Sequence, residues 1–93
     1  MKNMIKIDYK TKMPNSVRCF IFGSAVYSEK PDDLDVAIIY DKTMISINDA
    51  IQYRHNLEDE LNKMLEMNID TLLLSKEEEE EMCFLANAKH IPL

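Results

Sequence analysis

The apolar run at residues 34–40 restricts the fold more than any other part of this sequence. Four consecutive apolar residues, Val36 to Ile39, follow Asp35 within the run. A strand with one face in water alternates apolar and polar side chains, whereas a strand without that alternation is covered on both faces. The sequence therefore predicts a buried strand in a sheet that has helices packed on it.

Two further strands and two helices are predicted around this run. Residues 17–22 are apolar and β-favouring apart from Arg18, and residues 69–74 form a third apolar run. Ser46 and Asp49 form the Ser-x-x-Asp pattern of a helix start, and Ser75 with Glu78 forms a capping box before an acidic first turn. The first helix should continue to about residue 67, with apolar residues at helical spacing: Ile47, Ile51, Leu57, Leu61, Met64 and Leu65. The predicted class is α/β (α+β), a short sheet with helices packed on it.

The bulk composition is that of a small globular chain. Its 93 residues are 46% hydrophobic and 30% charged, so we expect one domain that spans residues 1–93. Eleven basic residues against seventeen acidic ones give a net charge of −6. Such a charge argues against a nucleic acid as partner, whereas a free nucleotide carried with its metal ion stays compatible with it.

The sequence also gives an expectation for the cellular compartment. Residues 1–13 lack the apolar core of a signal peptide, and no run of ~20 apolar residues is long enough to cross a membrane. Cys19 and Cys83 lie in apolar runs without the spacing of a metal-binding or redox pair. We therefore expect buried, reduced thiols and a cytoplasmic protein. Residues 1–14 receive no prediction, because their apolar residues fit a strand and a helix equally well.

Acidic residues mark the start of two of the predicted strands. Asp33 and Asp35 are two residues apart, so both side chains point to the same face of the sheet, with Cα atoms roughly 7 Å apart. Carboxylates gathered on one side suit a pair of Mg²⁺ ions whose coordination is completed by substrate phosphates. Asp70 begins the next strand, where a short sheet would bring it beside them. The three are candidate metal ligands, and one of them would be free to act as a base.

Gly23, the only glycine in the chain, ends the first predicted strand and precedes Ser24. Glycine permits a close backbone approach, and a turn opened by Ser24 would present N–H groups to an anion. Gly23 and Ser24 are therefore candidate phosphate-binding residues. Lys30, in the connection that follows, is a further candidate for a phosphate contact, with a solvated surface lysine as the alternative.

These features also have purely structural interpretations. The sequence Pro31-Asp32-Asp33 favours a turn, and acidic residues at strand ends are often surface residues. Glutamates 77–81 would spread around a helix and face solvent. The seven methionines are expected to fill gaps in the core.

The order of the motifs resembles the minimal nucleotidyltransferase domains of the DNA polymerase β superfamily. The motifs are Phe22-Gly23-Ser24, then Asp33-Leu34-Asp35-Val36-Ala37-Ile38, then Ile69-Asp70-Thr71-Leu72-Leu73, and the likeness covers about residues 16–90. It implies a short mixed sheet backed by helices, and a nucleoside triphosphate, usually ATP, bound through Mg²⁺. It also implies roles by position: Gly23 and Ser24 hold the terminal phosphates, Asp33 and Asp35 hold both metal ions, and Asp70 helps to activate the attacking hydroxyl.

Two functions fit the resemblance and stay open at this point. The first is an Mg²⁺-dependent nucleotidyltransferase that passes a nucleotidyl group, AMP in the case of ATP, to a hydroxyl acceptor, which a partner protein can carry. The second is an interaction protein with little or no turnover, comparable to the toxin–antitoxin members of this group. Two features keep the second open: one expected domain leaves no second domain to bind an acceptor, and eight residues connect Ser24 and Asp33 where members of this group more often have about ten.

Overall fold

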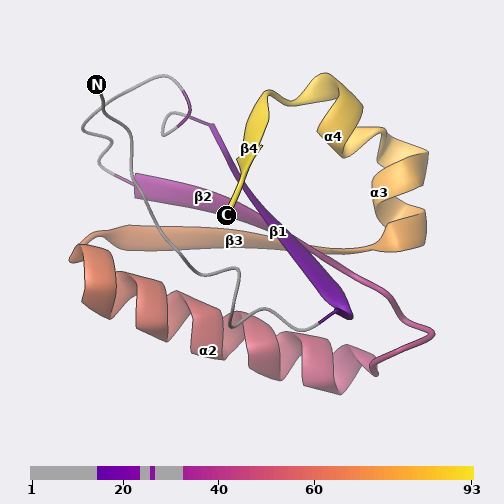
Figure 1. Cartoon of the computed structure of the whole chain (residues 1–93), viewed down its shortest axis with the longest axis horizontal. Coiled ribbons are helices and arrows are strands. Elements are labelled where there is room, and N and C mark those ends of the chain that lie inside the picture. The colour runs from indigo at the N-terminus through magenta and orange to yellow at the C-terminus, as the bar shows by residue number, and fades with distance from the viewer. Residues whose placement is uncertain (1–14, 24–25, 27–32) are drawn as a thin grey trace.

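The structure is a computed structural model that describes residues 15–23, 26 and 33–93. Its centre is a four-stranded sheet in the order β3-β2-β1-β4 (Figure 1). β1 runs antiparallel to β2 and β4, whereas β2 and β3 are parallel. The strands are β1 (Val17–Phe22), β2 (Asp33–Tyr40), β3 (Asn68–Ser75) and β4 (His90–Pro92), and the helices are α2 (Ile47–Leu65), α3 (Lys76–Met82) and α4 (Phe84–Asn87). The predicted class, a short mixed sheet with helices packed on it, is confirmed.

The crossover between the parallel strands β2 and β3 is made by α2, which begins as predicted. The hydroxyl of Ser46 accepts a hydrogen bond from the backbone N–H of Asp49 at 3.1 Å and caps the helix. The helix ends at Leu65, two residues before its predicted end. Glu66 adopts the left-handed conformation (φ 54°), and its N–H donates to the carbonyl oxygen of Asn62 at 2.8 Å. This cap stops the helix and turns the chain into β3.

One face of the sheet packs on α2. Leu34, Val36 and Ile38 of β2 and Leu57 and Leu61 of α2 are fully buried in the larger core cluster. The strand residues are spaced by two and the helix residues by four, so each element presents one apolar side to the other. Burial of five such side chains gives this interface its stability, at about 1.5–3 kcal/mol for each side chain.

The other face of the sheet is covered by α3 and α4. Phe20, Ile39 and Leu74 are buried there, and Phe84 and Leu85 pack against them. β2 is therefore buried on both faces, as its unbroken apolar run predicted.

Some of the apolar residues of α2 lie away from its buried side. The buried residues of the helix are Ala50, Leu57 and Leu61, which lie on one stripe because they are seven and four residues apart. Ile47 and Ile51 stand off that stripe, and 49% and 38% of their surface is exposed. The spacing alone does not indicate which apolar residues of the helix are buried, because the helix packs on the sheet along one stripe only.

Two predictions about sulfur-containing residues also need correction. Cys19 is buried and free, as expected, but Cys83 is free and exposed. Cys83 is the left-handed residue (φ 51°) that separates α3 from α4, where the backbone turns at the surface. Met44, Met64 and Met82 are each more than half exposed and fill no gap in the core.

The chain after β3 follows the prediction only at its start. The hydroxyl of Ser75 accepts from the N–H of Glu78 at 3.1 Å, and the Glu78 carboxylate accepts from the N–H of Ser75 at 2.9 Å. This is the predicted capping box. α4 and β4 were not predicted, because elements of four and three residues are too short to show a period. No helix in residues 33–93 combines the length and the apolar character that crossing a membrane requires.

Candidate functional site

Asp35 of β2 and Asp70 of β3 lie directly opposite each other in the parallel register. Asp33 lies opposite Asn68, two pairs earlier, and alternation places it on the same face of the sheet as Asp35. This face is the one that carries Ile39 and is covered further along by α3 and α4. Neighbouring strands are about 4.8 Å apart, so the topology brings three carboxylates from two segments of the chain to one end of the sheet.

The negative charges of Asp70 and Asp33 act on the Asp35 carboxyl. Partial burial, and then the negative charges of Asp70 and Asp33, raise the pKa of the Asp35 carboxyl above its ordinary value. Like charges in one site disfavour the ionised form, and a cation would relieve the repulsion.

Gly23 lies against the side chain of Asp35. It follows Phe22, which pairs with Asp35 in the β1–β2 register, and it adopts a left-handed conformation with φ 73°. A Cβ atom at this position would collide with the Asp35 carboxylate oxygen Oδ2 and would lie 3.2 Å from its Cγ. The chain turns directly afterwards, where the N–H of Val26 donates to the carbonyl oxygen of Gly23 at 3.1 Å. Both the conformation and the space thus require glycine.

The other two phosphate-binding candidates, Ser24 and Lys30, lie outside the described residues. The predicted roles of Gly23 and the three aspartates stay predictions, because position alone does not establish a role.

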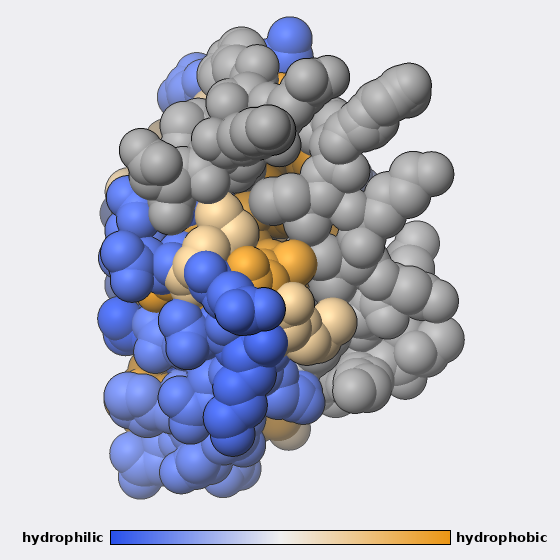
Figure 2. Space-filling view, turned by 90° about the vertical axis from the view of Figure 1, so that its left-hand side faces the viewer, coloured by the Kyte–Doolittle hydropathy of each residue, from blue (hydrophilic) through white to orange (hydrophobic). Residues whose placement is uncertain are grey.

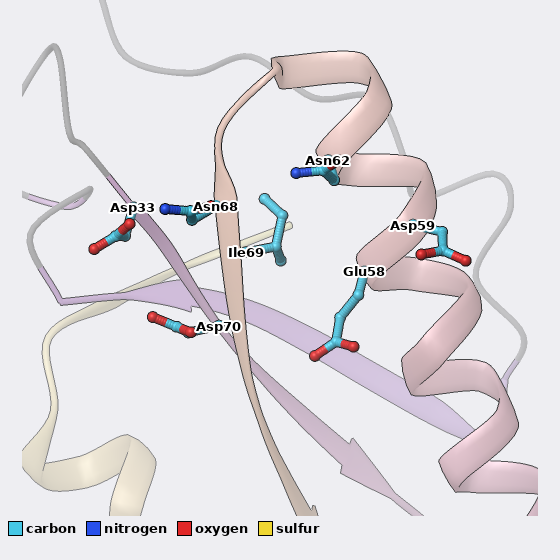
Figure 3. Close-up of a pocket in the computed structure, with 7 residues that line it drawn as sticks. All are labelled: Asp33, Glu58, Asp59, Asn62, Asn68, Ile69 and Asp70. Carbon is cyan, nitrogen blue, oxygen red and sulfur yellow. The ribbon is translucent and has the colours of Figure 1, made fainter.

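A cavity of about 500 Å³ opens beside the acidic residues, at the end of the molecule where α2 ends and β3 begins. Figure 3 shows Asp33, Asn68 and Asp70 on one side of β3, and Glu58 reaching from α2 toward β3 on the other. The surface seen from this end is largely hydrophilic over the described residues (Figure 2). The lining residues are Asp33, Glu58, Asp59, Asn62, Asn68, Ile69 and Asp70.

The α2 residues of this lining were missed by sequence reasoning. Glu58, Asp59 and Asn62 follow the helical spacing of a polar side, which in the sequence has the same pattern as a solvated helix surface. These helix residues line the cavity only because β3 is parallel to β2, which places the start of β3 beside the end of α2.

The residues fit Mg²⁺ by donor chemistry, but they form no closed ligand set. Among residues 15–23, 26 and 33–93, no three Asp, Glu, His or Cys side chains are arranged to hold an ion by themselves. Mg²⁺ usually takes one or two carboxylates together with waters and substrate phosphates. Asp33, Asp35 and Asp70 supply hard oxygen donors on one face, and the Asp35 carboxylate lies directly against Gly23. The site would thus hold the ion together with a phosphate.

Comparison with known proteins gives one match. The model of the family described as polymerase beta, nucleotidyltransferase matches residues 4–92, nearly the whole chain. No curated protein matches significantly, and neither does any solved structure. The matched segment includes Gly23 and all three aspartates at the end of the sheet.

Proposed function

The chain belongs to the polymerase β nucleotidyltransferase family, and on this premise we propose that it transfers a nucleotidyl group from an Mg²⁺-bound nucleoside triphosphate to a hydroxyl acceptor. The observation that carries the proposal is the direct pairing of Asp35 with Asp70 beside Gly23. ATP is the proposed substrate, with AMP as the transferred group.

In this proposal the acidic residues divide the work. Asp33 and Asp35 would hold the metal ions with Asp70 as a further ligand, and Asp70 would also accept the proton of the acceptor hydroxyl. When bound, Mg²⁺ supplies charge neutralisation at the phosphate oxygens. The hydroxyl oxygen forms a bond to the α-phosphorus, the bond from that phosphorus to the pyrophosphate breaks, and pyrophosphate leaves.

The surroundings of the aspartates support the same division. Gly23 brings the backbone of this turn directly against the Asp35 carboxylate, so a phosphate bound to an ion on Asp35 would lie near the backbone as well. The cavity that Asp33 and Asp70 line has room for an acceptor next to the proposed base. Positioning and charge neutralisation are the main means of catalysis in phosphoryl-group chemistry, so the site needs no nucleophilic side chain.

Isothermal titration with ATP and Mg²⁺ tests the nucleotide-binding part of this proposal. We expect the native chain to bind, and the Asp33→Ala, Asp35→Ala double variant to lose binding. A matched control is the Glu80→Ala, Glu81→Ala variant, which removes the same charge from exposed positions of α3. A native chain that fails to bind would contradict the nucleotide function.

Transfer is tested separately with ATP labelled at the α-phosphate. The native chain, incubated with a cell extract, should pass the label to an acceptor, and the Asp70→Asn variant should not. Binding of ATP without any transfer would favour the alternative, an interaction protein with the fold of a nucleotidyltransferase.

A further inference from the structure

The strand that carries Asp70 is held by its neighbours on one side only. Within the described residues, β3 is an edge strand whose single strand partner is β2. An edge strand can rotate about its own axis more easily than a central one, because one row of backbone groups has no ladder. The direction in which Asp70 points therefore depends on what holds β3 from the side of α2.

Thr71, the next residue of β3, makes that link. Its hydroxyl accepts a hydrogen bond from Nε of Arg54 at 2.8 Å and donates one to Oε2 of Glu58 at 2.5 Å. Arg54 and Glu58 are one turn apart on α2, and their Nε and Oε2 atoms are 3.8 Å apart. The hydroxyl is thus held from two directions by two charged groups.

This arrangement fixes orientation as well as distance. Both bonds are charge-assisted, which makes them roughly twice as strong as bonds between neutral groups. They are also partly buried, with 39% of the Arg54 side chain and 28% of the Glu58 side chain exposed. In Figure 3 Glu58 extends from α2 to β3 beside the cavity, next to the place where Asp70 leaves the other side of the strand.

We propose that Thr71 is a positioning residue for Asp70, and this rests on the function proposed above. Successive residues of a strand point to opposite faces, so a hydroxyl held on the α2 face fixes the backbone that carries the carboxylate on the other. Arg54 and Glu58 hold Thr71, and through it they keep Asp70 opposite Asp35.

The Thr71→Val variant keeps the shape of the side chain and removes both hydrogen bonds, whereas Thr71→Ser keeps the hydroxyl. Thr43→Val is a matched control, because the Thr43 hydroxyl also donates to a carboxylate, that of Asp41, at the opposite end of β2. Arg54→Met is a second variant, which removes one of the two bonds from the helix to Thr71 and leaves β3 unchanged in sequence.

The first measurement is Mn²⁺ affinity in the presence of a non-hydrolysable ATP analogue, followed by electron paramagnetic resonance. Loss of an interaction that orients a metal ligand typically costs about 10- to 100-fold in metal affinity, so we expect a roughly tenfold loss of Mn²⁺ affinity in Thr71→Val. Thr71→Ser and Thr43→Val should bind like the native chain, and Arg54→Met, which keeps the bond from Thr71 to Glu58, should lose affinity but less than Thr71→Val. Native affinity in Thr71→Val would overturn the proposal.

The second measurement, amide hydrogen exchange, does not depend on nucleotide binding. Thr71→Val should exchange faster at residues 68–71, while residues 34–40 of β2 keep their native rates. Unchanged exchange at residues 68–71 would overturn the positioning role even where the native chain binds Mn²⁺. A native chain that binds no Mn²⁺ at all would instead overturn the proposed function, so the two failures are distinguishable.

Discussion

The carboxylate of Asp35 occupies the space that a side chain on Gly23 would need. Gly23 also has φ 73°, a conformation that costs a residue with a Cβ atom about 1–2 kcal/mol. We therefore expect Gly23→Ala to lower the free energy of unfolding by about 1–3 kcal/mol and to weaken ATP binding. Urea denaturation and titration calorimetry measure the two effects.

A double-mutant cycle separates the collision from the backbone strain. Asp35→Ala removes the atoms that Gly23→Ala would meet, so the double variant should be more stable than the sum of the two single changes implies. The backbone strain alone would remain. Simple additivity of the two changes would show that Gly23 and Asp35 do not compete for space.

Because the pKa of Asp35 is raised in the folded chain, we expect the ionised Asp35 carboxylate to lower the free energy of unfolding at neutral pH. The folded chain binds the Asp35 proton more tightly than the unfolded chain, so stability is lost as the pH rises from the ordinary value of 3.8 through the folded pKa. Asp35→Asn removes the charge. We expect its melting temperature to exceed the native one by roughly 1–4 °C at pH 7.5, with a gain that shrinks toward pH 4.

Glu81→Gln is the control for this comparison, because it removes one negative charge from an exposed position of α3. If Glu81→Gln raises the melting temperature as much as Asp35→Asn does, the gain reflects the net charge of −6 and not the crowding of the aspartates.

The two cysteines should differ sharply in reactivity. Burial raises the pKa of the Cys19 thiol to about 11, although the nearby hydroxyl of Tyr53, 3.8 Å from the sulfur, lowers it in part. About one in a thousand such thiols is ionised at pH 8, and the thiolate is the reactive form. Ellman's reagent should therefore modify Cys83 quickly and Cys19 only after unfolding. Cys83→Ser should abolish the fast phase, and a fast phase that persists in this variant would contradict the burial of Cys19.

The capping box at Ser75 should support stability without serving the site. Ser75→Ala removes the acceptor for the N–H of Glu78, and caps of this type contribute about 1 kcal/mol. Ser75 is five residues along β3 from Asp70, a separation of roughly 16 Å. We expect a lower free energy of unfolding and native ATP affinity, and a loss of affinity in a fully folded variant would contradict this separation.

Local patterns in the sequence predicted most of the elements. The strand at residues 34–40 followed from its unbroken apolar run, and Ser46 and Ser75 followed from capping rules that involve only the next three residues. α4 and β4 escaped prediction because they exist through contacts: Ile91 pairs with Ile21, about seventy residues away. The exposed Ile47 shows the same limit, since spacing gives a helix and packing decides which side is buried.

The candidate site likewise has one part that local sequence patterns predict and another part that depends on contacts between distant segments. Asp33 and Asp35 share a face by local geometry, which the sequence alone predicts. The position of Asp70 depends on the register of a parallel pair, and that register depends on how α2 carries the chain back. The position of Glu58 beside the cavity depends both on the register of β3 and on how α2 packs on it. The sequence alone therefore does not indicate that this helix residue lies near the site.

The parallel pairing of β2 and β3 separates the two ends of the sheet. The aspartates stand where these strands begin, whereas the connection at residues 41–46 leaves from the other end of β2, roughly 20 Å away. Lys42, Thr43 and Met44 are exposed in that connection. It is therefore a suitable place for a fluorophore, an affinity tag or an inserted domain, because a change of chain length there would be absorbed far from the acidic residues.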